Sequence, residues 1–491
     1  MFEIAYNSFS WLLNASSQKD GAFSFLFAIL GICVWKPIAP LPPGPRGLPI
    51  VGYLPFLGFD NLHQAFTDLA GAYGPIYKLW LRSKLTIVIS SPSLVKEAVR
   101  DHDVALSERD PSIAAQVITF AANDIAFDSY SSPSWKNKRK ILATDMLSNA
   151  NINAFYGLRR EQVMKTVWDV YKNVGKPFDI GELAFLTAIN ATIGLMWGGK
   201  LRGKEGAKIE GHFKDLSSQI MVLLARPNIS DVFPSIARFD VQGIEREMKK
   251  ILQSFNELFD SVIELRKNAA TENEKVNGMS GRKSDFLQIL LDLHNESEDS
   301  ATSFTMEHIK GHSGGWNRYC FNYDRVGNGR ANATSVKDGQ MIKESFRMHP
   351  PLPLLFPRCC GQSLVLGGYT IPKGSRVFLN MWSINMDPNI WDNPSEFHPE
   401  RFLNDTDKFD FHGNDFRYLP FGAGRRKCPG LSLGEKMLAL ILASLLHSFD
   451  WKLPQGTELD LSSKFGLVVK KKIPLRLIPM PRLTNPELYK E

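Results

Sequence analysis

Cysteine is scarce in this sequence, and its spacing is irregular. The 491 residues include five cysteines: Cys33, Cys320, Cys359, Cys360 and Cys428. The number is odd, and no spacing fits a disulfide framework or a zinc site. The sequence therefore excludes a small disulfide-stapled scaffold and predicts that the folded part lies in the cytosol.

The sequence also lacks low-complexity linkers after residue 50 and long runs of like charge. No low-complexity linker divides the chain after residue 50, so we expect one large domain. The net charge of +7 is scattered, which argues against a nucleic-acid partner and favours an acidic partner or an anionic lipid surface. A composition with 44% hydrophobic residues, 32 Phe and 10 Trp suits a core that encloses an apolar ligand.

The hydrophobic run near the N-terminus, Ala22–Trp35, is shorter than the roughly 20 residues that span a bilayer. A signal-anchor, a cleaved signal peptide and a core helix all remain open. Lys36 follows the run, and the positive-inside rule then favours a cytosolic side for the rest of the chain. We predict that residues 1–36 form a truncated apolar anchor and that the proline-rich residues 37–49 form a stiff extended hinge.

The remaining body, residues 50–491, has mainly helical periodicity with a minor share of strand. Ile76–Leu81 and Leu85–Ile89 alternate as paired strands of a hairpin. From residue 150 to about residue 293 apolar residues recur every three or four positions, which predicts helices. Short strands and turns return after Pro350. The predicted class is mainly α with minor β.

Cys428 lies among glycines and arginines in Phe421–Gly430. Gly424 permits a tight turn that a Cβ would obstruct, and Pro429 is suited to the first turn of a buried helix over Leu431–Phe449. A helix N-terminus favours an anionic sulfur. The arrangement suits a thiolate ligand of haem iron, which donates electron density that favours O–O cleavage. The alternative is a buried structural cysteine beside a basic turn.

The spacing of this loop is specific. Arg426 is placed to pair with a haem propionate, and Gly430 lets the helix approach a porphyrin closely. The string F-x-x-G-x-R-x-C-x-G resembles the haem-binding loop of cytochrome P450s. The resemblance implies the cytochrome P450 fold, a single large domain with an N-terminal membrane segment. Its five fixed positions are Phe421, Gly424, Arg426, Cys428 and Gly430.

Two further motifs match the same family. Trp135 and Arg139 lie one helical turn apart, like the family's Trp and Arg that hydrogen-bond a haem propionate. Arg358 matches a family position that contacts another propionate. Taken alone, the Trp135 motif also fits an amphipathic surface helix.

A third motif implies a structural role. Glu344 and Arg347 form an E-x-x-R on a short helix, and Arg401 follows in a Pro-Glu-Arg-Phe segment. In cytochrome P450s these three residues make a buried charge network behind the haem. Such burial is tolerable only when every charge is paired.

The resemblance also implies a chemistry. It implies haem b, iron protoporphyrin IX, as the cofactor and the insertion of one atom of O2 into a small apolar organic molecule. It further implies that electrons come from NADPH through NADPH–cytochrome P450 reductase. The family relation, closest to plant-type microsomal members, places the protein at the endoplasmic reticulum membrane with its catalytic domain on the cytosolic face. By analogy, the loop between Ala105 and Tyr130 lines the substrate pocket.

One part of the sequence departs from the family. Cytochrome P450s activate oxygen at a central helix that carries G-x-[D/E]-T, yet residues 312–340 lack this acid and Thr pair and have no helical period. With permissible codons from Trp316 onward, a one-base shift yields Gly-Thr-Asp-Thr-Ala-Ser-Thr-Met-Ile-Glu-Trp. We therefore hypothesise that residues 312–340 are largely an out-of-frame translation of this helix.

Two functional interpretations remain open. The first is a haem-thiolate monooxygenase. The alternative is a catalytically inactive product of a damaged gene or gene model that lacks the oxygen-activation helix. Because the acid and Thr pair is absent, the catalytic residues stay unknown, and so does the substrate.

Overall fold

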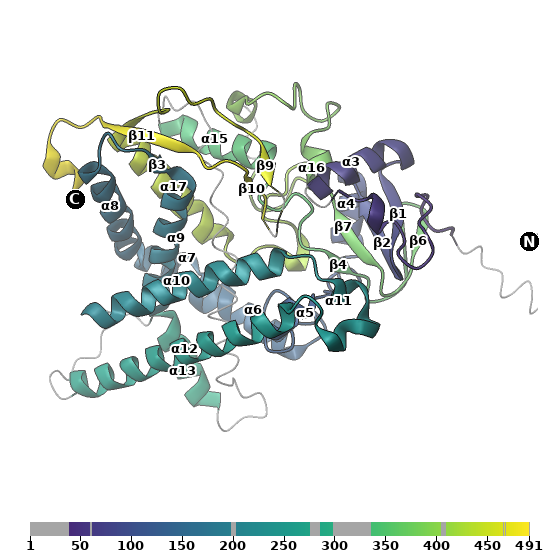
Figure 1. The fold of residues 1–491 in the computed structure, drawn as a ribbon, viewed down its shortest axis with the longest axis horizontal. Helices are drawn as coiled ribbons and strands as arrows, with labels where there is room; N and C mark the ends of the chain where they lie inside the picture. Colours follow the sequence, from purple (N-terminus) through teal and green to yellow (C-terminus); the bar gives the residue numbers. More distant parts are fainter. Residues whose placement is uncertain are drawn as a thin grey trace, which may run out of the picture.

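The computed structural model describes residues 39–58, 61–197, 203–274, 285–297, 335–403, 409–464, 466 and 468–490. The predicted anchor over residues 1–36 and most of the anomalous stretch over residues 312–340 lie outside these residues. Figure 1 shows a sheet-rich part, with the start of the described chain, at one end of the molecule. Most of the long helices gather at the other end.

The α-helices are α3 (Leu62–Tyr73), α4 (Pro92–Lys96), α5 (Ile113–Ile118), α6 (Pro133–Ile141), α7 (Asn149–Ala154), α8 (Tyr156–Lys172), α9 (Ile180–Trp197), α10 (Gly203–Ala225), α11 (Ile229–Val232), α12 (Ile244–Glu274), α13 (Phe286–Ser297), α15 (Ser335–Met348), α16 (Met381–Asn385) and α17 (Leu431–Ser448). Two π-helical turns, η3 (Glu97–Asp101) and η4 (Leu142–Met146), extend α4 and α6. Short 3-10 turns are η1 (Leu54–Phe56), η5 (Pro234–Phe239), η6 (Pro399–Phe402), η7 (Gly424–Arg426) and η8 (Pro486–Tyr489).

The strands are β1 (Ile76–Leu81), β2 (Lys84–Ile89), β3 (Phe178–Asp179), β4 (Arg358–Cys359), β5 (Leu364–Leu366), β6 (Tyr369–Ile371), β7 (Arg376–Leu379), β8 (Phe449–Lys452), β9 (Ser463–Lys464), β10 (Lys470–Lys471) and β11 (Arg476–Pro481). The largest described sheet has the order β1-β2-β7-β4. In it β1 and β2 are antiparallel, with Ile76 opposite Ile89, whereas β2 and β7 are parallel. The predicted hairpin is confirmed.

Successive side chains of a strand point to opposite sides, and both sides of this sheet contribute to a buried core. Tyr77 and Val88 belong to a small core that includes Phe66 of α3. Ile87 and Ile89 belong to a second core that includes Val95 of α4. Helix α3 thus packs on one side of the sheet, and α4 packs on the other. The turn that follows α4 approaches the Cys428 loop.

The described part of the proline-rich segment lies against strand β1 of this sheet and against β6 of the small β5-β6 sheet. The Lys78 N–H donates to Pro43 O at 2.8 Å, and the Thr370 N–H donates to Pro40 O at 3.0 Å. A Cβ on Gly44 would collide with the backbone of Lys78. This described part of residues 37–49 therefore packs on the body, and its role as a stiff extended hinge stays a prediction.

The helical end contains the main core. Buried side chains of α12 recur at helical spacing: Met248, Ile251, Phe255, Phe259 and Val262. They belong to the same core as buried residues of α8, α9 and α17. The prediction that residues 150–293 are chiefly helical is confirmed for the residues described there.

Helix α17 begins at Leu431, as the sequence predicts, and ends at Ser448, one residue before the predicted end. Its N-cap is Gly430, so Pro429 lies in the preceding turn and not in the first helical turn. Pro429 and Gly430 form the turn that connects Cys428 to the helix. Helices α9 and α17 are long and apolar enough to span a membrane, yet half of each is buried inside the fold, as expected for core helices.

Candidate functional site

The loop around Cys428 is closed by a backbone hydrogen bond. The Cys428 N–H donates to Phe421 O at 3.0 Å. The Phe421 ring packs at 5.5 Å from the Phe346 ring of α15. Gly424 has φ of 69°, and an added Cβ would collide with Asp103. The expectation that this turn requires glycine is confirmed, and the loop presents a partly exposed Cys428.

The surroundings of the Cys428 thiol act in opposite directions. Burial raises its pKa, whereas a hydrogen bond from the Gly430 backbone and the charges of Arg139 and Lys427 lower it. Burial is the largest of these effects, so the pKa of the Cys428 thiol is raised overall. A bound cation would favour the thiolate, because a coordinating thiol loses its proton.

Helix α6 brings two of the predicted residues to this loop. The Ser132 hydroxyl accepts from the Trp135 N–H at 3.4 Å and caps the helix, and Pro133 occupies its first turn. Arg139 donates to Lys427 O, beside Cys428, at 2.7 Å. The Trp135 indole N–H donates to Ile125 O at 2.9 Å, so a propionate would have to replace that acceptor.

Two arginines from other segments reach the same region. Arg426 donates to Ser107 O at 2.7 Å and to Asp128 O at 2.5 Å, and its guanidinium lies 4.5 Å from the centre of the Trp135 ring. Arg358, on β4, donates to Ala423 O at 2.9 Å. The acceptors named here are neutral backbone carbonyls.

We call Arg139, Arg358 and Arg426 the loop arginines. Burial is the largest influence on each of them, and it lowers their pKa values, that of Arg426 to about 10. Nearby negative groups oppose this shift without cancelling it. Carboxylates form stronger, charge-assisted hydrogen bonds with guanidinium than carbonyls do. The loop arginines therefore fit an anionic ligand such as the propionates of a haem.

The third motif forms a network of its own. Arg347 donates to both carboxylate oxygens of Glu344, at 2.8 and 2.7 Å, and Arg401 donates to Glu344 at 3.1 Å. Arg347 also donates to Asn385 O, and the His398 N–H donates to Glu344. Glu344 and Arg347 are fully buried. The three residues that sequence reasoning grouped thus lie in one network, which carries its own carboxylate.

Sequence reasoning missed two residues beside the loop. Asp103, in the turn after η3, accepts from the Arg425 N–H at 3.0 Å and lies 3.5 Å from Arg358. Lys138, the buried neighbour of Arg139, pairs with Asp128 at 3.1 Å and so holds the segment that Arg426 contacts. No spacing pattern signals Asp103, because it lies more than 300 positions before its partner in the sequence.

Comparison with known proteins identifies the family. The family model described as cytochrome P450 matches residues 42–314 and 339–478, and it leaves residues 315–338 unmatched. The chain therefore belongs to the cytochrome P450 family of haem-thiolate monooxygenases.

Its relatives include plant enzymes of similar length. It is 35% identical to the cytochrome P450 monooxygenase 76AD131 of Lophophora williamsii, over 90% of this chain and 93% of that one. It is 34% identical to the carnosic acid synthase of Salvia pomifera, with the same coverage. It is 32% identical to the flavonoid 3'-monooxygenase CYP75B137 of Crocosmia x crocosmiiflora, over 91% and 93%.

Solved structures agree on the fold. A zebrafish cytochrome P450 with progesterone superposes with a TM-score of 0.68 at 23% identity, over 86% of this chain and 99% of that one. A second, with abiraterone, gives 0.65 at 23% identity, over 86% and 100%. The expected class, mainly α with minor β in the cytochrome P450 fold, is confirmed.

Proposed function

We propose that the protein is a monooxygenase that inserts one atom of O2 into a small apolar organic molecule with haem b as its cofactor. The observation that carries the proposal is that the loop arginines gather at the loop of the partly exposed Cys428: Arg139 donates to Lys427 O and Arg358 donates to Ala423 O, while Arg426 belongs to the loop itself. Family membership supports the same chemistry. A haem bound here supplies the reductive activation of O2, in which the second oxygen atom leaves as water.

Each site residue has a distinct part in this proposal. Cys428 would provide the sulfur ligand of the haem iron, and the loop arginines together with Trp135 would hold the propionates. Phe421 fixes the loop through its carbonyl oxygen and its ring, as the contacts above describe. Gly424 and Gly430 would let the backbone approach the porphyrin closely. Glu344, Arg347 and Arg401 would have a structural role, because their network fixes α15, whose Phe346 ring packs on Phe421 of the loop.

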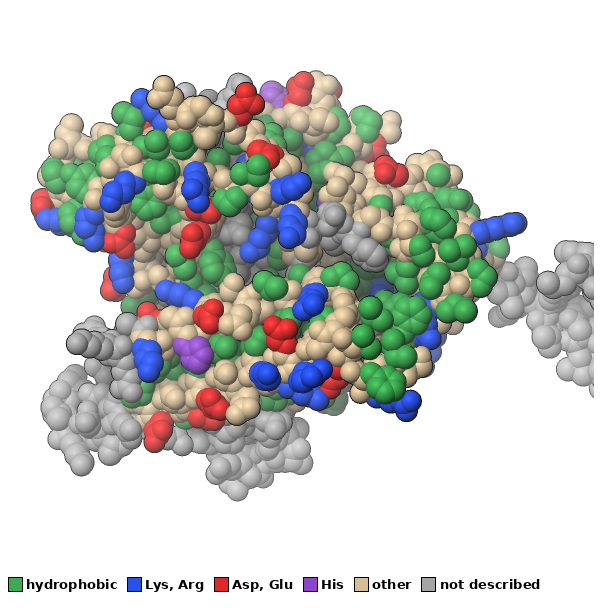
Figure 2. Space-filling model, viewed as in Figure 1, with side chains coloured by type: hydrophobic (Ala, Val, Ile, Leu, Met, Phe, Trp, Pro, Cys, Tyr) green, Lys and Arg blue, Asp and Glu red, His purple; other side chains and the backbone are tan. Residues whose placement is uncertain are grey.

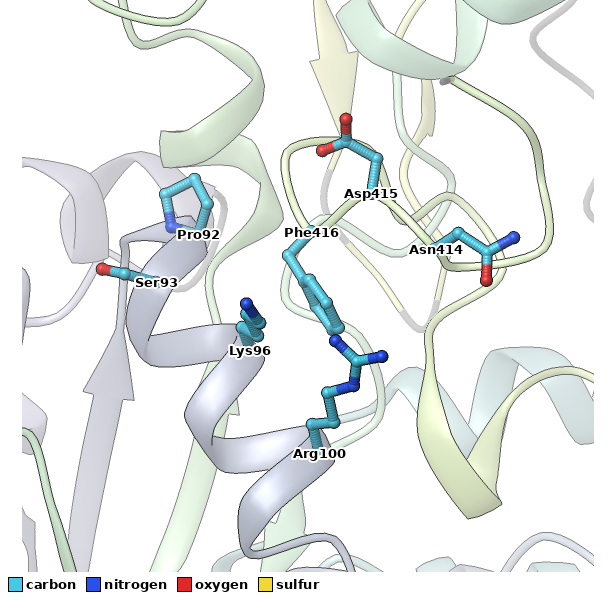
Figure 3. A pocket seen from close by; sticks show the side chains of 7 residues that line it. All are labelled: Pro92, Ser93, Lys96, Arg100, Asn414, Asp415 and Phe416. Atoms are coloured by element: carbon cyan, nitrogen blue, oxygen red, sulfur yellow. The ribbon is translucent and has the colours of Figure 1, made fainter. Parts of the chain in front are cut away.

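The electron donor that we propose is NADPH–cytochrome P450 reductase. A surface groove of about 470 Å³ lies between the α4–η3 segment and the loop that precedes the cysteine loop, and Lys96 and Arg100 line one of its walls (Figure 3). Arg425 is exposed, and Lys427 donates to His412 O of the neighbouring loop. These cations form a basic surface close to Cys428, which suits an acidic flavoprotein partner.

The endoplasmic reticulum membrane, with the catalytic domain on its cytosolic face, is the proposed location. An apolar surface supports membrane contact. Ile50 and Phe56 are exposed near β1, and Phe239 and Val241 are exposed beyond α11. Arg82 joins the two groups, since it packs on the Phe233 ring at 4.8 Å.

The surroundings of this surface fit the same location. Figure 2 shows hydrophobic side chains gathered at this end, with Lys and Arg beside them. The described chain begins at the same end, so an anchor formed by residues 1–36 would emerge next to the apolar surface. Exposed apolar patches mark interaction sites, and a basic rim suits anionic lipid headgroups.

For the substrate we propose a plant secondary metabolite of low polarity. The names of the relatives mention carnosic acid and flavonoids. The segment between Ala105 and Tyr130, which includes α5, would line the pocket. It packs against α12 and α10, so the helical end and this segment together would enclose the substrate.

A second candidate function is supported by one observation. The family match is interrupted over residues 315–338, within the stretch that lacks the acid and Thr pair. A product of a damaged gene or gene model that cannot activate oxygen is therefore the alternative. A transcript read across residues 300–345 would reveal the codons and decide whether the frame is shifted there.

The carbonyl complex of the reduced protein tests the haem-thiolate proposal. With haem supplied, the native chain should show the absorbance band characteristic of thiolate ligation, and Cys428→Ser should remove it. A band that survives in Cys428→Ser, or a native chain that never gives one, would refute Cys428 as the axial ligand. Addition of reductase and substrate then separates the alternatives, because only the active enzyme couples NADPH consumption to product.

A further inference from the structure

Asp103 lies where three segments of the chain meet: its own, the Cys428 loop and strand β4. It follows the π-helical turn η3, and its side chain is 12% exposed. Its carboxylate accepts from the Arg425 N–H, at 3.0 Å for one oxygen and 3.3 Å for the other. The loop that carries Cys428 is thus attached to a carboxylate from a distant part of the sequence.

The same carboxylate meets two guanidinium groups. Its Oδ1 lies 3.5 Å from Arg358, and its Oδ2 lies 3.8 Å from the Arg425 side chain. The segment around it makes matching contacts, because Ser107 O accepts from Arg426 and Leu106 O accepts from Arg358. Two of the three loop arginines are therefore positioned by residues 103–107.

Glycine at position 424 allows this approach. Gly424 has φ of 69°, and a Cβ there would collide with the Asp103 carboxylate and with Val99 O. The close approach of Asp103 thus explains why position 424 requires glycine, even without a cofactor. It also places the Arg425 N–H where the carboxylate can accept from it.

We infer that Asp103 is a positioning residue that holds the Cys428 loop and orients Arg358 before a cofactor binds. This inference rests on the proposed haem-thiolate function, since that function gives the two oriented groups their purpose. Asp103 itself touches neither the iron nor the propionates in this role. It acts through the Arg425 backbone and the Arg358 guanidinium, so its loss should loosen the loop and misdirect Arg358.

Two variants separate the two contacts. Asp103→Ala removes both of them. Asp103→Asn keeps an oxygen that can accept from the Arg425 N–H but loses the charge that attracts Arg358. The matched control is Asp110→Asn, because Asp110 follows in the same segment and binds cations, Arg376 at 2.7 Å and Lys84 at 3.1 Å, on the sheet.

Hydrogen–deuterium exchange of the full chain without added haem gives the first readout. Amide exchange in Phe421–Gly430 should be at least about 5-fold faster in Asp103→Ala than in the native chain, since the Arg425 N–H loses its acceptor. Asp103→Asn should restore most of the protection, and Asp110→Asn should match the native chain in this peptide. Native-like exchange in Asp103→Ala, or equal loosening in Asp110→Asn, would overturn the inference.

The spectrum of the haem-loaded protein gives the second readout. Asp103→Ala should convert a substantial share of the reduced carbonyl complex from the thiolate-ligated band to the band of non-thiolate haem, and Asp103→Asn should convert less. An unchanged band in Asp103→Ala counts against the positioning role. If the native chain itself shows no thiolate band, the proposed function fails, while the exchange experiment still decides whether Asp103 holds the loop.

Discussion

Two groups of arginines in this molecule differ in what neutralises them. Arg347 and Arg401 share the carboxylate of Glu344, at distances between 2.7 and 3.1 Å. Arg139 and Arg426 instead donate to backbone carbonyls. The charges of the first group are paired within the protein. The guanidinium donors of the second group bind neutral carbonyls, and an anionic ligand would form stronger hydrogen bonds with them. The difference separates a structural network from the proposed propionate-binding site, although both are rich in arginine.

The largest effect should follow from removing the shared carboxylate. Glu344→Gln leaves two guanidiniums, one of them fully buried, with a neutral acceptor, and breaking such a pair costs about 3–5 kcal/mol. Ordinary domains have only about 5–15 kcal/mol of stability, so we expect a large loss of soluble, cooperatively unfolding protein. Denaturant unfolding of the purified variant would measure it.

The exposed neighbour Glu400 supplies the control. It lies in the same turn as Arg401, and its carboxylate is about half exposed, 3.4 Å from His398. Glu400→Gln should change the unfolding free energy by less than about 1 kcal/mol. Equal effects of the two substitutions would remove the distinction between the two groups of arginines.

Substitution of a loop arginine should lower haem affinity more than it lowers the stability of the fold, in contrast to Glu344→Gln. Arg139→Gln replaces a charged donor to Lys427 O by a weaker neutral one and leaves no buried charge unpaired, so the unfolding free energy should fall by less than it does in Glu344→Gln. Hydrogen bonds from charged groups contribute about 1.5–3 kcal/mol, and haem affinity should therefore fall about 10- to 100-fold. A haem titration followed by absorbance would measure this.

Lys140 provides the comparison for Arg139. It is the next residue of α6 and is exposed to solvent. Lys140→Gln should leave haem affinity within about 2-fold of the native value, because a surface charge contributes little. If Arg139→Gln destabilised the fold as strongly as Glu344→Gln, the loop arginines would have to be regarded as structural too.

The smallest effect should come from the cap of α6. Ser132→Ala removes the acceptor for the Trp135 N–H and should cost about 1 kcal/mol of stability. Because the helix carries Trp135 and Arg139, haem affinity should fall slightly as well. Ser131→Ala, at the exposed neighbouring position, should shift the unfolding midpoint by no more than measurement error; a shift as large as that of Ser132→Ala would argue against the cap.

The sequence predicted best what depends on local pattern. The hairpin of Ile76–Leu81 with the following strand and the helix after Cys428 follow from short-range periodicity. The Glu344, Arg347 and Arg401 network came from a family motif, and it assembles as the motif implies.

Contacts between distant segments could not be predicted in this way. The docking of the proline-rich segment on Lys78 and the contact of Asp103 with Arg425 depend on tertiary packing. The sequence predicts Pro429 in the first turn of α17, but this residue lies in the turn before it. Helix propensity does not distinguish these two positions well, since proline suits both. The predicted out-of-frame stretch stays a hypothesis for the transcript to test.

The central claim is that the loop arginines bind the anionic propionates of a haem. A cofactor with modified propionates tests this claim most directly. The native chain would be titrated with iron protoporphyrin IX and with its dimethyl ester, whose propionates carry no charge. We predict at least about 10-fold tighter binding of the free acid and a smaller preference in Arg139→Gln. Equal affinity of the native chain for the two porphyrins would contradict the assignment of these arginines to the propionates.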